Sequence, residues 1–183
     1  MTHYIDIELK PIKELRENIL LNQVYTVFHK RLYDLNSKDI GVSFPRYRLK
    51  LGILLRVHAS QKNLEKLEEK EWLGEYKQYC KVSVIQDVPE QVQYRNICRV
   101  QQNMTEAKLR RLIKRGTISQ EDVKKYKIKM MQEGLENPYV ELKSGSNGQF
   151  HRRFLEFGEI SLEQIKGEFD LFGLSKEATI PWF

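Results

Sequence analysis

Cysteine is scarce in this sequence, because Cys80 and Cys98 are the only two among 183 residues. They form no CxxC motif and no second pair exists, so the sequence indicates neither a zinc site nor a disulfide framework. Long apolar runs are also missing, since no stretch approaches the roughly 20 residues that a membrane-spanning helix needs. The opening residues, MTHYIDIELK, lack the architecture of a signal peptide. We therefore expect no membrane association, no metal or other cofactor, and a reducing, cytoplasmic location.

Acidic residues are outnumbered: 25 Asp and Glu stand against 31 Lys and Arg, which gives a net charge of +6. The chain is 40% hydrophobic and 31% charged, which is ordinary for a globular protein and unlike a disordered one. Its length allows one medium-sized domain or two small ones. A basic protein is compatible with a nucleic-acid partner, but many basic proteins bind none. The positions of the charges are therefore more informative than their sum.

Most of the positive charge lies in one stretch, from Arg99 to Arg115. This stretch contains six Lys or Arg and one Glu, so it carries +5 of the total of +6. From Thr105 onward it predicts a short helix, with Thr105 as a candidate N-cap and Gly116 after its end. The helical spacing puts three residues on an apolar stripe: Leu109, Leu112 and Ile113. The basic side chains beside this stripe are Lys108, Arg110, Arg111, Lys114 and Arg115.

The like charges of this arginine-rich helix destabilise it, since such pairs at helical spacing repel by a few tenths of a kcal/mol each. An anionic partner would offset that repulsion, whereas the simpler alternative is a solvated basic face. The preference for arginine favours the first interpretation, because the guanidinium group matches phosphate oxygens and the guanine edge in a bidentate manner.

Residues 1–93 show alternating and helical periodicities that predict an α+β domain. The expected elements are a strand over 5–9, a helix over 15–32, strands over 41–44 and 53–60, a helix capped by Ser60, and a strand over 81–85. Their order is that of the ferredoxin-like βαββαβ arrangement, in which two helices cover one face of an antiparallel sheet. RNA-recognition motifs share this fold but use aromatic side chains on the central strands. The expected third strand, GILLRVHAS, has none, so we do not expect that mode of RNA binding.

The polar segment 87–93 is expected to link this domain to a smaller α/β domain, residues 94–183, which contains the arginine-rich helix. A single strand over 94–101 should precede that helix. A second helix should follow, where Ser119 and Asp122 form a capping-box pattern. Strands are expected over 139–143 and 149–157, joined by the loop SGSNGQ. The closing residues GLSKEATIPWF stay apolar to the last position, so the C-terminus is expected to be docked.

Several side chains suggest chemistry by their type and position. His29 lies at the edge of the buried face of the first helix, where it is either a boundary histidine or a general base, because histidine changes charge near physiological pH. His58 alternates with core positions on a strand and is interpreted as structural. Arg99 and Gln101 lie two apart on an expected strand and point the same way. They either address neighbouring bases or are solvated on an edge strand.

Seven segments, in this order, resemble one known family: HYIDIELKP, VFHKRL, GVSFP, LRVHAS, RVQ before the basic helix, SGSNGQ and FGLSKEATIPWF. From end to end the chain resembles the CRISPR repeat-processing endoribonucleases of type I-F systems. The resemblance implies a ferredoxin-like domain followed by one with an arginine-rich helix. It also implies metal-independent cleavage of a repeat RNA at the 3′ base of a hairpin. The implied partners are that CRISPR RNA hairpin and other subunits of the type I-F effector complex, in which the product is retained.

The resemblance assigns roles residue by residue. It makes His29 the catalytic histidine and Ser144 the serine that positions the ribose, with Ser146 near the active site. Arg99 and Gln101 match the pair that reads bases at the foot of the stem. On the basic helix, Arg111 and Arg115 match major-groove contacts, and Lys108 and Lys114 match phosphate contacts, with Arg110 beside them.

Three positions depart from the family pattern. Phe172 stands where well-known members have a tyrosine near the active site, so any role of that hydroxyl is absent. His151 stands where an aromatic side chain stacks beneath the terminal base pair, so either His151 or its neighbour Phe150 is expected to serve. Gly116 replaces a polar residue at the end of the basic helix, and one helical residue is missing nearby.

The expected chemistry follows from RNA itself, since the 2′-hydroxyl beside the scissile phosphate is a nucleophile already in place. Acting as a general base, His29 would take its proton, and Ser144 would align the ribose. The products would be a 2′,3′-cyclic phosphate and a 5′-hydroxyl. Two other classes stay open. A non-catalytic RNA-hairpin-binding subunit is one, and a metal-dependent nuclease is the other, disfavoured because no acidic and histidine cluster has ligand spacing.

Overall fold

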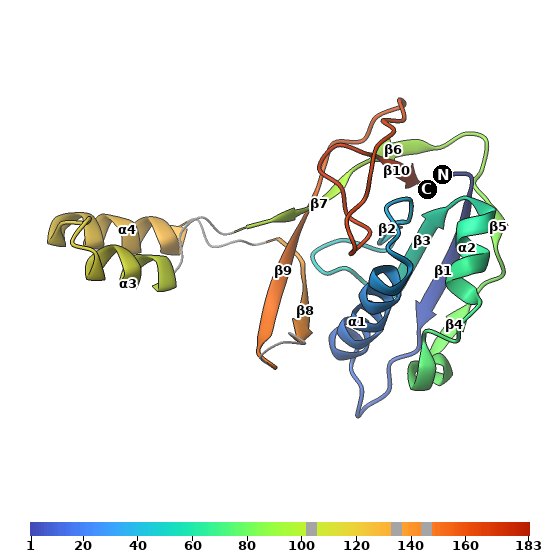
Figure 1. The fold of residues 1–183 in the computed structure, drawn as a ribbon, viewed down its shortest axis with the longest axis horizontal. Coiled ribbons are helices and arrows are strands. Elements are labelled where there is room, and N and C mark those ends of the chain that lie inside the picture. Colours follow the sequence, from blue (N-terminus) through green and yellow to red (C-terminus); the bar gives the residue numbers. More distant parts are fainter. Residues whose placement is uncertain (102–105, 133–136, 144–147) are drawn as a thin grey trace.

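The computed structural model describes residues 1–101, 106–132, 137–143 and 148–183 and contains both α-helices and β-sheets (Figure 1). This confirms the expected mixture of α and β structure. The first half contains β1 (His3–Leu9), α1 (Glu17–Leu35), β2 (Gly41–Ser43), β3 (Leu54–Ala59), α2 (Gln61–Glu68), a 3₁₀ helix (Gly74–Tyr79) and β4 (Cys80–Val82). Within the described ranges no helix is long and apolar enough to span a membrane.

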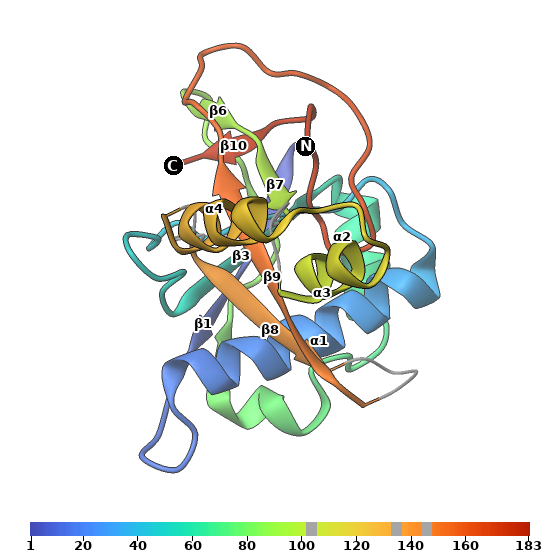
Figure 2. The ribbon, with the colours of Figure 1, turned by 90° about the vertical axis from the view of Figure 1, so that its left-hand side faces the viewer.

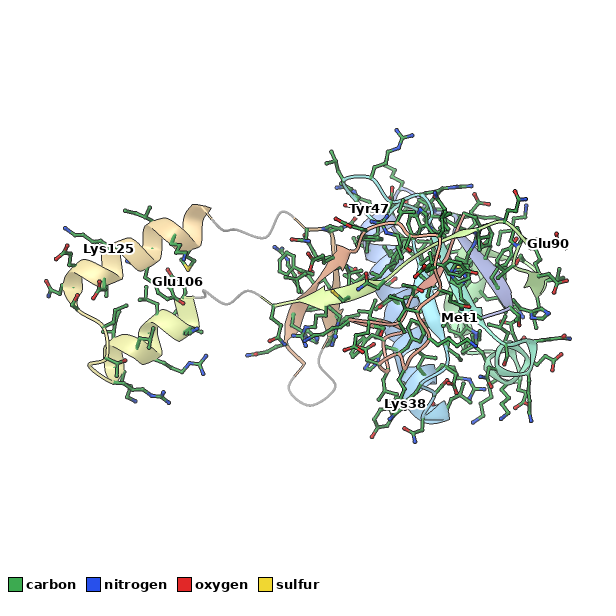
Figure 3. All side chains as sticks on the ribbon, turned by 90° about the horizontal axis from the view of Figure 1, so that it is seen from above. Met1, Lys38, Tyr47, Glu90, Glu106 and Lys125 are labelled. Carbon is green, nitrogen blue, oxygen red and sulfur yellow. The ribbon has the colours of Figure 1, made fainter. Side chains whose placement is uncertain are left out.

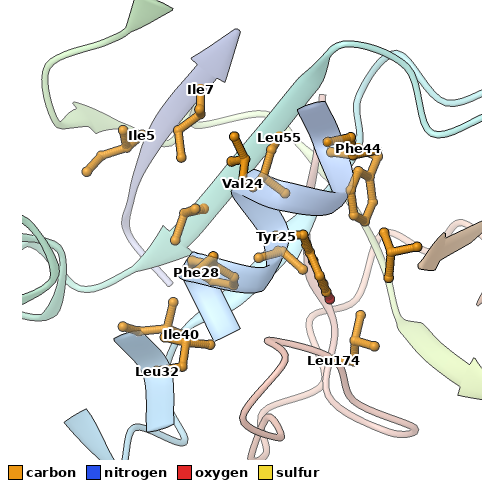
Figure 4. Close-up of a cluster of buried hydrophobic side chains, with 14 of the residues drawn as sticks. Ile5, Ile7, Val24, Tyr25, Phe28, Leu32, Ile40, Phe44, Leu55 and Leu174 are labelled. Carbon is orange, nitrogen blue, oxygen red and sulfur yellow. The ribbon is translucent and has the colours of Figure 1, made fainter. Parts of the chain in front are cut away.

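The first sheet has the strand order β2-β3-β1-β4, and each of these neighbours is antiparallel. Ile5 pairs with Val57 and Ile7 with Leu55, so one face of the sheet is apolar. Helices α1 and α2 bury their apolar sides in the same core. The α1 side chains in this core include Val24, Tyr25, Phe28 and Leu32 (Figure 4). Ser60 caps α2 as expected, since its Oγ accepts the Asn63 N–H at 3.3 Å.

The expected linker over 87–93 is partly wrong, because it begins inside the first sheet. Strand β4 ends at Val82, and β5 (Gln86–Asp87) then pairs with the start of β1. The interruption has a local cause. The hydroxyl of Ser83 accepts the Asp6 N–H at 3.0 Å. In a continuing strand, a backbone carbonyl would have accepted that N–H.

The expected single strand over 94–101 is also wrong, because it is two strands in different sheets. β6 (Gln93–Arg95) pairs with β10 (Ile180–Trp182), whereas β7 (Ile97–Val100) pairs with β9 (Phe150–Phe157). Between them, Asn96 donates through Nδ2 to the Lys176 carbonyl at 2.7 Å and accepts the Gly158 N–H at 3.0 Å on its own carbonyl. The bond to Gly158 is the first of the β7–β9 ladder, and the pairing partner changes at Asn96 from β10 to β9, so Arg95 and Arg99 belong to different sheets.

The three-stranded sheet β7-β9-β8, completed by β8 (Tyr139–Lys143), packs against α1 (Figure 2). One hydrogen bond ties them directly, from the Glu141 N–H to Asn22 Oδ1 at 2.9 Å. The buried apolar side chains of this sheet are Ile97, Val140, Leu142 and Leu155. Because Arg153 pairs with Val140 and His151 with Leu142, Arg153 and His151 share the face that is turned toward α1.

The C-terminal segment returns to the first sheet, which confirms that it is docked. Ile180 is buried, and the Val42 N–H donates to the Gly173 carbonyl at 3.0 Å. The Phe183 ring lies 5.0 Å from the Tyr4 ring and 4.0 Å from the Arg56 guanidinium, on the face away from the helices. Strand β3 is therefore buried on both faces. This explains why its polar residues Arg56 and His58 are buried as well as its apolar ones.

His58 lies within that covered face and is structural, as expected. Its side chain is fully buried, and Nε2 lies 2.8 Å from the Ser43 hydroxyl. Burial, followed by the nearby Arg56 cation, lowers the pKa of His58 well below the ordinary histidine value. The residue is therefore neutral at physiological pH.

The helices α3 (Glu106–Lys114) and α4 (Gln120–Gln132) lie side by side at one end of the molecule, apart from the sheets (Figures 1 and 3). Ser119 caps α4 as expected, because its Oγ accepts the Asp122 N–H at 3.1 Å. Helix α3 ends where Gly116 adopts a positive φ of 67°, as glycine commonly does after a helix. Leu109 faces inward, at 3% exposure, whereas the expected cap Thr105 lies outside the described residues.

Gly173 tests how tightly the C-terminal segment is packed. Its φ is +71°, and an added Cβ would lie 3.0 Å from Val42 Cγ1, whereas Gly74, at φ +51°, has open space. A left-handed conformation alone costs about 1–2 kcal/mol for a residue with a side chain. We predict that Gly173→Ala lowers the free energy of unfolding by about 2 kcal/mol or more, and Gly74→Ala by about 1 kcal/mol. Urea titration of both variants measures this, and equal losses would contradict the packing described.

Candidate active site

The imidazole of His29 is fixed by one hydrogen bond. The residue follows the buried Phe28 on α1 and is itself half-buried. Its Nδ1 lies 2.7 Å from the backbone carbonyl oxygen of Leu171. A carbonyl only accepts, so Nδ1 donates, and the neutral ring then carries its lone pair on Nε2. This is the arrangement that a general base requires, with one nitrogen anchored and the other available.

The plane of the imidazole is fixed by Phe172. The two ring centroids are 3.6 Å apart, with an interplanar angle of 11°. The guanidinium carbon of Arg153 lies 3.4 Å from the same Phe172 centroid. Two planar groups at these distances cannot share one face of a ring, so Phe172 is sandwiched between His29 and Arg153. Phe172 therefore contributes through its ring faces, although it lacks the tyrosine hydroxyl.

The loop that carries Phe172 is held by three hydrogen bonds. Asp170 Oδ1 accepts the N–H groups of Phe172 at 2.8 Å and Leu174 at 3.0 Å. The Phe172 carbonyl accepts the Tyr25 hydroxyl at 2.7 Å. Burial, and next the charge of Asp170, raises the pKa of Tyr25 far above its ordinary value. The hydroxyl thus stays protonated and continues to donate.

Arg153 is the least expected member of the site. Its side chain is only 8% exposed, and its ion pair with Asp170 is long, at 3.9 Å from Nη1 to Oδ2. Among the residues that the structure describes, its Nε has no hydrogen-bond partner. Burial, followed by the positive charge of Arg99, lowers the pKa of Arg153. A cation is therefore buried here with little compensation.

A groove of about 1140 Å³ runs between strands β7 and β9 and the C-terminal segment. Its basic and amide lining includes Arg99, Gln101, Arg153 and Lys176. Arg99 and Gln101 are exposed and open onto the same groove, as their spacing predicted. Their proposed reading of bases stays a prediction.

The basic side chains of α3 and of Arg115, which follows it, form a surface apart from α1, the helix that carries His29 (Figure 1). All five are exposed: Lys108, Arg110, Arg111, Lys114 and Arg115. Arg110 lies 3.5 Å from Glu106 in an exposed i,i+4 ion pair, and Arg111 donates to the Ala107 carbonyl at 3.3 Å. Exposed pairs of this kind contribute little to stability, so these charges remain accessible to an anionic partner.

The remaining predicted residues are distributed as follows. Phe150 is 69% exposed on the outer face of β9, whereas His151 lies on the face turned toward α1. Ser144 and Ser146 lie outside the described residues. In the described part of the chain, no group of three or more His, Cys, Asp and Glu residues is arranged to hold a metal ion.

Comparison with known proteins identifies the family. The family model described as CRISPR-associated protein (Cas_Csy4) matches residues 4–183. The chain belongs to the Cas_Csy4 family. This confirms, at the level of the family, the resemblance seen in the sequence motifs.

Two relatives within the Cas_Csy4 family are each named CRISPR-associated endonuclease Cas6/Csy4. The protein from Escherichia coli (strain UTI89 / UPEC) is 34% identical over 184 residues, and that from Pseudomonas aeruginosa (strain UCBPP-PA14) is 34% identical over 187 residues. Both alignments cover 100% of each chain. A solved structure titled "Structure A of CRISPR endoribonuclease Cse3 bound to 19 nt RNA" gives a TM-score of 0.40 at 12% identity over 99% of this chain and 100% of the other. At that level the likeness carries no argument.

Two residues of this Cas_Csy4 site escaped the sequence analysis. Side chains alternate along the expected strand over 149–157, which puts Arg153 on the same face as His151, but this alternation gives no reason to connect either residue with His29. Tyr25 lies four residues before His29, on the same side of α1, and its hydrogen bond to Phe172 depends on a loop nearly 150 residues away. Such a contact has no local signature.

We predict the tautomer of His29 in this Cas_Csy4 protein. At alkaline pH, where histidine is neutral, the proton should reside on Nδ1, because the Leu171 carbonyl accepts it. Long-range ¹H–¹⁵N correlation spectra of the ¹⁵N-labelled protein, with His29→Gln to assign the signal, measure the tautomer directly. A ring protonated mainly on Nε2 would contradict the hydrogen bond to Leu171.

Proposed function

We propose that this protein is a metal-independent endoribonuclease that cuts CRISPR repeat RNA at the 3′ base of a stem-loop. The observation that carries the proposal is the His29 imidazole, whose Nδ1 is occupied by the Leu171 carbonyl and whose ring is stacked on Phe172. This leaves Nε2 to accept a proton. The endonuclease names of the two relatives, each aligned over its full length, support the same conclusion.

The proposed reaction uses a nucleophile that the substrate supplies. The ribose 2′-oxygen attacks the adjacent phosphorus, and its proton passes to Nε2 of His29. The bond from phosphorus to the 5′-oxygen breaks, and the departing 5′-oxygen takes a proton from solvent water, which gives a 2′,3′-cyclic phosphate and a 5′-hydroxyl product. General base catalysis of this kind typically contributes about 10²–10⁴-fold. Ser144, which lies outside the described residues, is proposed from the family resemblance to align the ribose.

RNA recognition is divided between two surfaces in this proposal. The arginine-rich helix α3 binds the hairpin, whose major groove opens near a helix end or loop. Arg99 and Gln101, which line the groove, read the bases at the foot of the stem. His151, rather than Phe150, stacks beneath the terminal base pair, because His151 shares the face of β9 that is turned toward α1. Phe150 points away.

Further proposals concern domains and partners. The strand order β2-β3-β1-β4 supports a ferredoxin-like domain over residues 1–93, and the β7-β9-β8 sheet with α3 and α4 supports a second domain over 94–183. We also propose that the protein stays bound to its product in the cytoplasm and takes it into the type I-F effector complex. These two points rest on the family resemblance.

A cleavage assay tests the proposed reaction. The wild-type protein should cut its cognate repeat hairpin equally well with and without EDTA and leave a 2′,3′-cyclic phosphate. His29→Ala should reduce the single-turnover rate by about 10² or more and leave hairpin affinity nearly unchanged. His3→Ala, on the first strand and paired with Asp87, is the matched control and should cut normally. Cleavage by His29→Ala at the wild-type rate, or loss of cleavage in EDTA, would refute the mechanism.

Hairpin binding tests the role of α3. Arg115→Ala should weaken binding far more than His29→Ala does and should lower the magnitude of the salt dependence of log K by about 1. Lys62→Ala, which removes an exposed cation from α2, should change neither quantity. Titration of labelled hairpin over a range of salt concentrations measures both. An Arg115→Ala variant that matches the wild type at every salt concentration would remove α3 from the interface.

A further inference from the structure

Arg153 is a buried cation whose charge is balanced only in part, by the distant carboxylate of Asp170 and by stacking on Phe172. Arg153 is 7% exposed. The distance from its Nη1 to Asp170 Oδ2 is 3.9 Å, which is longer than a charge-assisted hydrogen bond. The other oxygen of Asp170 already accepts two backbone N–H groups. Nε of Arg153 has no hydrogen-bond partner among the described residues. A buried ion is costly unless it is paired and hydrogen-bonded.

The surroundings increase that cost. The pKa of Arg153 is lowered by burial and by the positive charge of Arg99, which lies on the neighbouring strand of the same sheet. A purely structural role does not explain the arginine, because an apolar side chain of similar length would fill the space beside Phe172 without burying a charge. Arg153 also lines the groove that contains Arg99 and Gln101. An anion in that groove could therefore reach it.

We propose that Arg153 binds a backbone phosphate of the RNA strand where that strand passes from the groove to His29. This inference rests on the proposed function, since the phosphate belongs to the RNA substrate. Guanidinium groups bind phosphate oxygens in bidentate geometry. The phosphate supplies a closer anionic partner than Asp170, and it also offsets the repulsion between Arg153 and Arg99.

The same contact connects binding with chemistry. Arg153 and His29 lie on opposite faces of Phe172, at 3.4 Å and 3.6 Å from its ring centroid. A phosphate that fixes the guanidinium plane also fixes the Phe172 ring, and the ring fixes the plane of the imidazole. Arg153 thus acts as a binding residue for the RNA and as a positioning residue for His29.

The test compares Arg153→Met, Arg153→Lys and Arg152→Met. Arg152 is the matched control, because it is the adjacent arginine, lies on the opposite face of β9 and is exposed beside Glu141. The dissociation constant is measured against salt concentration for a repeat hairpin with a 2′-deoxy nucleotide at the cut. Single-turnover cleavage is measured with the all-ribose hairpin, and urea unfolding is measured without RNA.

Arg153→Met should weaken binding by about 10- to 100-fold, the usual effect of losing a charge-assisted hydrogen bond. It should also lower the magnitude of the salt dependence by about 0.7, as expected for one phosphate on a single strand. Its stability without RNA should not decrease. Arg153→Lys should keep the salt dependence and cut more slowly, because an ammonium group does not stack on Phe172 as a guanidinium does. Arg152→Met should bind and cut like the wild type.

Other results would overturn the inference. An unchanged salt dependence in Arg153→Met would show that no phosphate contact is lost. An equal decrease of the salt dependence in Arg152→Met would show that the effect is not specific to the buried site. If Arg153→Met does not fold, a wild-type cleavage rate in Arg153→Lys overturns the positioning role. A wild-type protein that binds the hairpin without cutting it would refute the proposed nuclease, whereas the binding comparison at Arg153 would remain valid.

Discussion

The contact between α1 and the loop around Phe172 is the interaction on which the candidate active site depends. The loop supplies a carbonyl that orients His29 and a ring that supports it. In return, α1 supplies the Tyr25 hydroxyl that holds the loop. Because each side fixes the other, the imidazole has a defined plane and a defined donor nitrogen before any RNA is bound. Such preorganisation is what acid–base catalysis requires of a protein.

The chain builds this contact from its two ends. The C-terminal segment crosses to the first sheet, where it bonds to Val42, and its last residues cover the face away from the helices. The β7-β9-β8 sheet packs on the other side of α1 and brings Arg153 to Phe172. The face that RNA-recognition motifs use is thus occupied by the chain itself. In the proposed function, RNA recognition falls to the groove and to the separate surface of α3.

Local patterns in the sequence were sufficient for much of this architecture. The alternation of Ile5, Ile7 and Leu9 located β1, and the caps at Ser60 and Ser119 located the starts of two helices. The patterns failed where a distant segment decides the structure, as at Asn96, where pairing with β10 ends and pairing with β9 begins, so that one expected strand becomes two. The candidate site follows the same rule. His29 was found from its helix and its motif, but its pairing with Leu171 and the role of Arg153 arise from contacts between remote parts of the chain.

The central claim is that His29 presents Nε2 to the ribose at the cut. The most direct measurement is a structure of the protein bound to a repeat hairpin that carries a 2′-deoxy nucleotide at that position. The account predicts that Nε2 lies within about 4 Å of the 2′ carbon, consistent with a hydrogen bond to the missing hydroxyl, while Nδ1 still donates to Leu171. An imidazole whose Nδ1 faces the RNA, or an RNA that binds on another surface of the protein, would contradict it.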